Sequence, residues 1–220
     1  MRIKAIITGA TGMVGEGVLH ECLQSDEVEE VLVIGRKSCG VSHPKLREIV
    51  HGDFFDLSPI ENHLSGYDAC FFSLGVSSVG VSAEEYKKLT YDLTMNLAET
   101  VLKFNPGMTF CYVSGAGTDS SETGRLGWAR VKGKTENDLM KMPFKRVYAF
   151  RPGFLKPTKN LKNAGKLYAY IGWIYPLLRL VSTNYASTLE EFGKAMIKSV
   201  TKGCEKQILE VGDIIQLSKK

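Results

Sequence analysis

The sequence has few of the residues that build metal centres or disulfide frameworks. Its five cysteines are dispersed and odd in number, no two of them are spaced C-x-x-C, and its four histidines form no ligand pattern. We therefore expect no metal site and no disulfide bridge. The cysteines are predicted to be small core residues of a protein kept in a reducing compartment.

The sequence also lacks a long apolar run. Its most apolar stretch, Leu167 to Val181, is shorter than the roughly 20 residues of a transmembrane helix and is interrupted by Pro176 and Arg179. Strand-like residues begin at Arg2, so no secretory signal peptide is expected. We see no internal repeat or low-complexity segment. These absences predict a cytoplasmic protein without a transmembrane segment.

The composition is ordinary for a soluble domain, with 44% hydrophobic and 24% charged residues among 220. A chain of this length can form one α/β domain with a sizeable core. We expect a single domain over residues 1–220, in which 154–205 contributes a cap on the substrate side.

The net charge of +4 conceals an asymmetry. Residues 1–131 carry 11 Lys and Arg against 17 Asp and Glu, whereas residues 132–220 carry 17 against 7. Part of the basic excess lies at Lys156, Lys159, Lys162 and Lys166. The favoured interpretation is a solvated surface; the alternative is an anionic substrate or surface near the C-terminal part. We predict no nucleic-acid partner.

A glycine-rich stretch near the N-terminus is the main functional motif. It follows an apolar, strand-like run at 3–7 and precedes residues 14–23, whose apolar positions recur at helical spacing. Gly9 permits a tight turn, Gly12 lets a pyrophosphate approach the backbone, and Gly15 lets the helix close on the strand. The helix N-terminus then offers free N–H groups to the phosphates. The other predicted contacts here are Thr11, Met13 and Val14. The alternative is a turn that only packs the helix on the sheet.

Further buried strands alternate with helical segments along the chain. Strands are expected at 31–35, 46–53, 67–75, 108–114 and 147–151, with an edge strand at 207–211 and helices at 83–104, from 127, and at 187–200. Alternation of this kind predicts a parallel sheet with right-handed crossovers. The expected fold is a three-layer, doubly wound α/β (Rossmann) fold with a small C-terminal helical cap.

Two cations follow the second predicted strand, where the adenosine ribose lies in this fold. An acidic residue there would bind the 2′-hydroxyl of NAD, whereas Arg accommodates the 2′-phosphate of NADP. This position holds Arg36 and Lys37 and no acid. Arg36 can form a forked pair with the phosphate, and Lys37 adds charge. We predict that NADP(H) is preferred and that NAD(H) is possible. The alternative is that both side chains only face water.

The ends of the third and fourth strands supply further cofactor contacts. Asp53 is predicted to accept from the adenine amino group and Phe54 to pack on the ring, although Asp53 could equally cap the next turn. Leu74 and Gly75 end the fourth strand at the rim where such sheets bind ligands, and Gly75 would let the backbone approach the cofactor.

The stretch 161–181 has no regular pattern. We expect it to form a cap over the substrate cleft, and a dimer interface, a protein partner or a membrane-surface contact is a second possibility.

Together these residues resemble the short-chain dehydrogenase/reductase superfamily. The spacing Thr8-Gly9-x-x-Gly12-x-x-Gly15 resembles its extended and atypical branches, and the closest resemblance is to atypical members around the Tat-interacting oxidoreductase-like protein and its bacterial relatives. Supporting pieces are Ile34-Gly35-Arg36-Lys37, Leu74-Gly75, Val131-Lys132-Gly133 followed by Glu136, and Phe150-Arg151-Pro152-Gly153. The resemblance implies that Arg151, Pro152 and Gly153 also bind the cofactor.

The superfamily uses a serine after the fifth strand and a Tyr-x-x-x-Lys pair on the next helix. By this resemblance Ser114 matches the serine and Lys132 the lysine, whereas the tyrosine position is Trp128. None of the nine tyrosines is followed four residues later by lysine. An indole N–H donates a hydrogen bond but is no acid or base near neutral pH. The substitution therefore affects proton transfer and leaves cofactor binding intact. The resemblance also implies that Lys132 binds the cofactor, through a hydrogen bond to the nicotinamide ribose.

Two functions remain open. The first is an NADP(H)-dependent oxidoreductase acting on an unidentified small carbonyl or alcohol with a modified acid. The second is a non-catalytic NADP(H)-binding redox sensor or protein-interaction scaffold. A sugar-nucleotide epimerase ranks last, since it normally needs the tyrosine and a larger C-terminal substrate domain.

Overall fold

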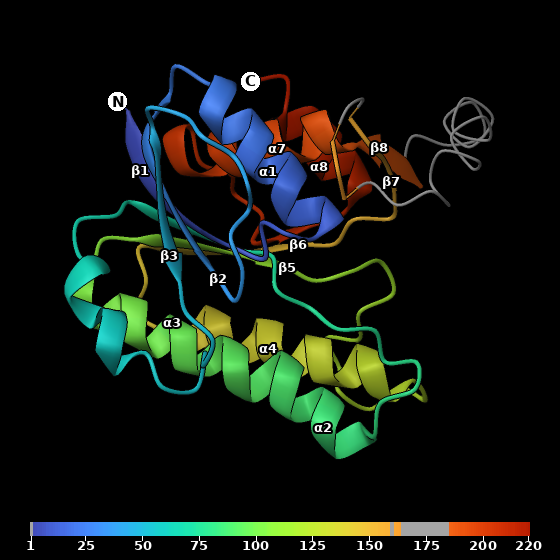
Figure 1. Ribbon diagram of the computed structural model, residues 1–220. Coiled ribbons are helices and arrows are strands. Elements are labelled where there is room, and N and C mark those ends of the chain that lie inside the picture. The colour runs from blue at the N-terminus through green and yellow to red at the C-terminus, as the bar shows by residue number, and fades with distance from the viewer. Residues whose placement is uncertain (1, 159–160, 164–184) are drawn as a thin grey trace.

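A parallel seven-stranded sheet forms the centre of the molecule. The computed structural model describes residues 2–158, 161–163 and 185–220, which form three layers (Figure 1). The strand order is β3-β2-β1-β4-β5-β6-β9, and each neighbouring pair is parallel. This order reverses between β1 and β4, as in a doubly wound dinucleotide-binding fold. The strands are β1 (Ile3–Thr8), β2 (Val28–Gly35), β3 (Leu46–Val50), β4 (Ala69–Phe72), β5 (Thr109–Val113), β6 (Arg146–Phe150) and β9 (Ile208–Leu209).

Helices cover both faces of this sheet. The helices α1 (Met13–Gln24), α7 (Leu189–Thr201) and α8 (Val211–Leu217) lie on one face, and α2 (Ala83–Lys87), α3 (Leu93–Phe104) and α4 (Gly127–Lys141) lie on the other (Figure 1). A short 3₁₀ helix, η1 (Ser58–His63), precedes β4. The predicted doubly wound α/β fold is therefore confirmed.

Side-chain alternation along the strands creates two separate cores. In β1, Ile3, Ala5 and Ile7 pack in the core beneath α1 and α7, whereas Ile6 packs in the core beneath α3 and α4. Successive strand residues point to opposite faces, so a strand buried on both faces needs an unbroken apolar run. This explains why β1, β2 and β4 are recognisable from sequence alone.

The long helix predicted over 83–104 is interrupted by a π-helical turn. Its segments α2 and α3 flank η2 (Lys88–Asp92), so the chain stays helical throughout. Ser82 caps α2 by accepting a hydrogen bond from the Glu85 backbone N–H at 3.1 Å. The apolar residues of this segment fit the spacing of an α-helix and that of a π-helix, so the sequence pattern does not reveal the extra residue of the π-helical turn.

The C-terminal helix α7 belongs to the α1 layer. Thr188 and Glu191 form a capping box at its start, and Gly17 and Gly193 lie where the two helices touch. A Cβ at Gly193 would lie 2.6 Å from Cγ of Glu21, so glycine permits this close packing. Part of the predicted cap region 154–205 is thus an ordinary layer helix.

A small second sheet adjoins this helix. It pairs β7 (Phe154–Lys156) with β8 (Ala186–Thr188) in parallel. Most of the stretch 161–181, predicted as a cap or partner surface, lies outside the described residues. No helix formed by the described residues has the length and apolar character needed to cross a membrane.

Candidate functional site

The glycine turn lies between β1 and α1, as the sequence predicts. Gly9 has φ +74°, in the left-handed region, and its carbonyl accepts a hydrogen bond from the Gly12 N–H at 2.9 Å. A Cβ at Gly15 would lie 2.2 Å from the Gly9 oxygen, and one at Gly9 would lie 2.5 Å from the Ser73 oxygen. The close backbone packing of the protein therefore requires glycine at both positions, whether or not a ligand binds.

Gly12 differs from the other two glycines. A Cβ there would meet only the Gly9 oxygen, at 3.4 Å, so the packing of the protein alone hardly requires glycine at this position. Gly12 is the N-cap of α1, and no side chain caps this helix end. Met13 and Val14 begin the helix and are half-buried. An open helix N-terminus with no Cβ in the way fits a pyrophosphate group.

A cavity of about 450 Å³ opens at this turn. Its lining consists of Gly9, Ala10, Thr11, Val33, Gly35, Arg36, Lys37 and Leu74. Five of these residues were predicted as cofactor contacts, and they come from three strand ends that the fold brings together. Among the described residues, neither Arg36 nor Lys37 has an ion-pair partner, and both are exposed. This arrangement fits the phosphates of a dinucleotide.

The two residues predicted beside the adenine lie differently from expectation. Phe54 is only 4% exposed and belongs to the core beneath α3, so the prediction that it packs on the adenine ring is wrong. Asp53 is exposed, and its Oδ1 accepts from the Phe55 N–H at 2.8 Å, which is the turn-capping role left open above. Phe55, the next residue, is 40% exposed.

The fourth strand ends at the same rim. Leu74 lines the cavity, and Gly75 is exposed with open space where a Cβ would lie. The predicted placement of both residues at the carboxyl edge of the sheet is therefore reproduced by the structure.

Ser114 follows β5 and forms a hydroxyl pair. Its Oγ lies 2.8 Å from Oγ1 of Thr118, and the Thr118 hydroxyl donates to the Gly115 carbonyl at 2.7 Å. Because a hydroxyl has one proton, Ser114 must be the donor to Thr118. The Ser114 oxygen is thereby left with lone pairs for a further partner. Sequence reasoning missed Thr118, which lies one loop turn beyond Ser114.

Lys132 reaches from α4 to the end of β5. Its Nζ donates to the Ser114 carbonyl at 3.3 Å and to the Val113 carbonyl at 3.5 Å, and it lies 5.4 Å from the ring centre of Tyr112. Burial lowers the pKa of Lys132 to about 8, against an upward effect of the Glu136 charge. Serine and lysine therefore meet beside one strand end, as the resemblance implies.

Trp128 stands one helical turn before Lys132 and lies against the serine loop. Its ring atom Cη2 is 3.6 Å from the position that a Cβ on Gly117 would take. The same loop packs tightly on α4, since a Cβ at Gly133 would overlap the Asp119 carbonyl oxygen. Trp128 thus contacts, at Gly117, the loop that holds the Ser114 and Thr118 hydroxyls.

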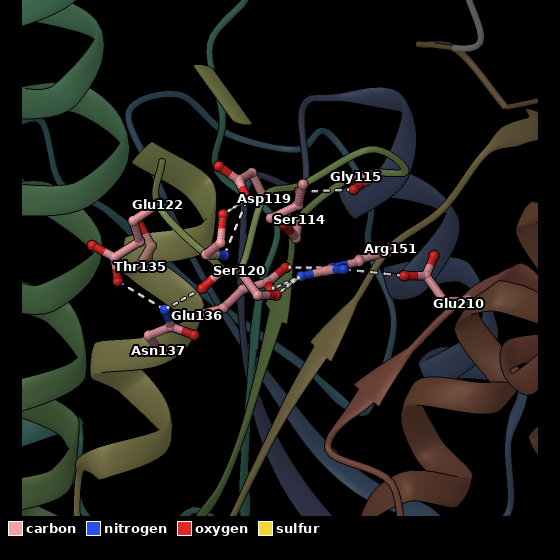
Figure 2. Close-up of polar contacts among 12 residues, drawn as sticks. Ser114, Gly115, Asp119, Ser120, Glu122, Thr135, Glu136, Asn137, Arg151 and Glu210 are labelled. Atoms are coloured by element: carbon pink, nitrogen blue, oxygen red, sulfur yellow. Dashed lines mark hydrogen bonds and ion pairs between the residues drawn. The ribbon is translucent and has the colours of Figure 1, made fainter. Parts of the chain in front are cut away.

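Arg151 is engaged by the protein itself. Its Nε donates to Glu136 at 3.0 Å, Nη1 donates to Glu210 at 3.2 Å, and Nη2 contacts both Glu136 and Ser120 (Figure 2). Four of its five N–H donors are thereby used. Glu136 is fully buried. The expectation that Arg151 binds the cofactor is corrected: its guanidinium ties α4 to the end of β6 and to the start of α8.

The two residues after Arg151 also shape the backbone. The Pro152 carbonyl accepts from the Ala116 N–H at 3.0 Å, and a Cβ at Gly153 would lie 2.5 Å from the Tyr185 oxygen. Both residues therefore have a packing role in this structure, and direct cofactor contact by them stays a prediction.

Glu16 is a buried acid that sequence reasoning missed. Its two carboxylate oxygens accept from the backbone N–H groups of Lys162 and Asn163, each at 2.7 Å. Residues 161–163 are thereby fixed against the first turns of α1. The local sequence shows only an acidic residue in the first turn of a helix, and a favourable interaction with the helix dipole is enough to explain an acid there.

No group of three His, Cys, Asp or Glu side chains within the described part of the chain could hold a metal ion.

Comparison with known proteins identifies the family of the chain. Residues 5–126 match the model of the NAD dependent epimerase/dehydratase family. The protein FMP52-2, mitochondrial, of Scheffersomyces stipitis is 30% identical over 159 residues, covering 70% of this chain and 67% of the relative. The protein FMP52, mitochondrial, of Debaryomyces hansenii is 27% identical over 199 residues, covering 89% and 86%.

The fold is shared with solved NAD-binding enzymes. The Bordetella bronchiseptica enzyme WbmG, solved in complex with NAD and UDP, has a TM-score of 0.68 at 13% identity, covering 99% of this chain and 78% of that protein. These relatives are named FMP52, so the predicted similarity to the Tat-interacting group is not confirmed. The expectation of a cytoplasmic protein is contradicted by relatives named as mitochondrial. The family match over more than half of the chain, on a fold with the expected glycine turn, shows that this protein belongs to the NAD dependent epimerase/dehydratase family.

Proposed function

We propose that this protein is an NADP(H)-binding oxidoreductase acting on a small alcohol or carbonyl compound. The observation that carries the cofactor assignment is the cavity at the end of β2 beside the open N-terminus of α1, where Arg36 and Lys37 have no ion-pair partner within the described part of the chain. No acid follows β2 to receive a ribose 2′-hydroxyl, whereas two cations suit a 2′-phosphate. NAD(H) fits the glycine turn equally well, so the preference depends on these two side chains.

The serine and lysine at the end of β5 supply the reaction site. A bound nicotinamide provides the hydride chemistry, and the protein has to position substrate and handle one proton. Because Ser114 donates to Thr118, its oxygen accepts a hydrogen bond from a substrate hydroxyl. This arrangement favours holding the alcohol, the reduced form of the substrate pair.

Lys132 is the group suited to carry the proton. Trp128 cannot exchange a proton near neutral pH. The Nζ of Lys132, whose pKa burial lowers to about 8, lies 3.3 Å from the Ser114 carbonyl oxygen. When the alcohol is oxidised, the neutral amine of Lys132 would accept the hydroxyl proton that Ser114 had oriented, and in the reverse direction its ammonium would return that proton. In this proposal Lys132 replaces the missing tyrosine, and Trp128 closes one side of the site.

A non-catalytic sensor or scaffold remains the second candidate. Two local observations favour it: the Ser114 proton is donated to Thr118, and the position four residues before Lys132 holds the indole of Trp128. Such a protein would bind NADP(H) and turn over no substrate. A partner or dimer contact through 161–181 would belong to this function.

Steady-state assays separate the two candidates. Panels of small alcohols with NADP⁺ and of carbonyls with NADPH are tested on the parent, Lys132→Met, Trp128→Tyr and the control Lys134→Met. Lys134 is on the same helix and pairs with Asp138 at the surface. The proposal expects activity in the parent, its loss in Lys132→Met and its retention in Lys134→Met. Activity that appears only in Trp128→Tyr would contradict the proposal and favour the non-catalytic candidate.

A further inference from the structure

A second cavity lies at the opposite edge of the sheet from the glycine turn. It has a volume of about 610 Å³ and is bounded by the start of β6, the loop 202–206 after α7, and α8. The glycine turn follows the carboxyl end of β1, whereas Arg146 begins β6. Since the strands are parallel, the two cavities are on opposite edges. The second cavity is therefore no extension of the cofactor site.

Cations from separate elements line this cavity. They are Arg146 at the start of β6, Lys202 and Lys206 in the loop, and Lys220 after α8. Lys206 forms an ion pair with Asp213, whereas the other three have no ion-pair partner among the described residues. Glu205 is the one further acid in the lining. The cavity thus has an excess of unpaired positive charge.

The loop beneath these cations is held in a defined shape. The Tyr148 hydroxyl accepts from the Cys204 N–H at 2.9 Å and donates to the Cys204 carbonyl at 3.0 Å. Gly203 has φ +76°, and a Cβ there would lie 2.6 Å from Nη1 of Arg146. The guanidinium of Arg146 therefore packs directly on the Gly203 backbone. A preformed loop reduces the ordering that ligand binding requires.

We propose that this cavity binds a small polyanion, a metabolite with two or more phosphate or carboxylate groups. A volume of several hundred Å³ is in the range of small-molecule sites. Converging cations raise the local concentration of such an anion. Cations near the last turn of α7 also complement its helix dipole, but Arg146 and Lys220 come from other elements.

The test is isothermal titration calorimetry at physiological ionic strength with two probes, inorganic triphosphate and citrate. The variants are Arg146→Gln and Lys202→Gln, with Lys219→Gln as a control that removes the same charge beside the cavity. Arg146 and Lys202 are both exposed, and thermal melts check that each variant is folded. The titrations are repeated on Arg36→Ala, because the cofactor cavity is also cationic.

We expect the wild type to bind at least one probe at a site that persists in Arg36→Ala. Arg146→Gln and Lys202→Gln each weaken this binding about tenfold, as loss of one charge-assisted contact predicts. Lys219→Gln and Arg36→Ala leave the affinity within about twofold. Comparison of triphosphate with citrate distinguishes a phosphate from a carboxylate ligand.

Three results would overturn the proposal. The first is no binding of either probe at millimolar concentration. The second is an affinity that Lys219→Gln lowers as much as Arg146→Gln does, which would indicate non-specific attraction. The third is binding that Arg36→Ala abolishes, which would place the anion in the cofactor cavity. None of these results depends on whether the protein has oxidoreductase activity.

Discussion

At the scale of single residues, Glu136 and Arg151 form the most deeply buried ion pair among the described residues. The carboxylate is fully buried, and the Arg151 side chain is 10% exposed. A pair so placed contributes little when both partners are present, but removal of one leaves an uncompensated buried charge. The pair also links α4 to α8 through Glu210.

This contrast gives a prediction for stability. Glu136→Gln should lower the free energy of unfolding by about 3 kcal/mol or more, the range for breaking a buried pair. The control is Glu190→Gln, which breaks an exposed i,i+4 pair with Lys194 and should change it by about 0.5 kcal/mol or less. Urea unfolding followed by circular dichroism measures both. Equal small effects would contradict the structural role given to Arg151.

Lys132 gives a prediction for pH dependence. Its pKa is lowered from 10.5 to about 8 in the folded protein, so between these pH values the unfolded chain binds more protons than the folded one. Stability contributed by this residue therefore rises with pH from about 8 to about 10.5. Below pH 8 the lysine is charged in both states, and the burial penalty is present in full.

The matched measurement compares the parent with Lys132→Met across this range. The difference in unfolding free energy, variant minus parent, should be largest below pH 8 and should shrink as the pH rises to 10.5. Other titrating groups cancel in this difference. A difference that stays constant with pH would show that Lys132 keeps an ordinary pKa.

At the scale of elements, the sequence indicates strands and turns better than side-chain contacts. The apolar runs of β1, β2 and β4 are buried on both faces, so their pattern is unambiguous. The π-helical turn at 88–92 could not be predicted, because the spacing of its apolar residues fits an α-helix as well as a π-helix. Phe54 and Phe55 are a second case in which the sequence is not sufficient, because the conformation of the turn decides which of the two adjacent rings is buried.

The glycine turn gives a prediction that separates folding from binding. Gly15→Ala should destabilise the protein, because its Cβ would lie 2.2 Å from the backbone oxygen of Gly9. Gly12→Ala should leave the melting temperature nearly unchanged and weaken dinucleotide binding at least tenfold, since the methyl group occupies the phosphate approach. Thermal melts and nucleotide titrations measure the two effects. Normal binding by Gly12→Ala would exclude a pyrophosphate at this turn.

At the scale of the whole molecule, topology places the site. Parallel strands in the order 3-2-1-4-5-6 bring Gly9, Arg36, Leu74 and Ser114 to one edge, although they are up to 105 residues apart. This gathering could be predicted from sequence, because it follows from the alternation of strands and helices. The contacts of Glu16 with 162–163 and of Arg151 with Glu210 could not, since no local pattern encodes a partner 59 or 146 residues away.

The most direct test is a titration of the purified protein with NADPH and with NADH, beside the Arg36→Ala variant. The account predicts tighter binding of NADPH, and in the variant a fall of NADPH affinity to the level of NADH. Equal binding of both nucleotides by the parent would contradict the phosphate site at Arg36. Binding of neither would contradict the cofactor assignment altogether.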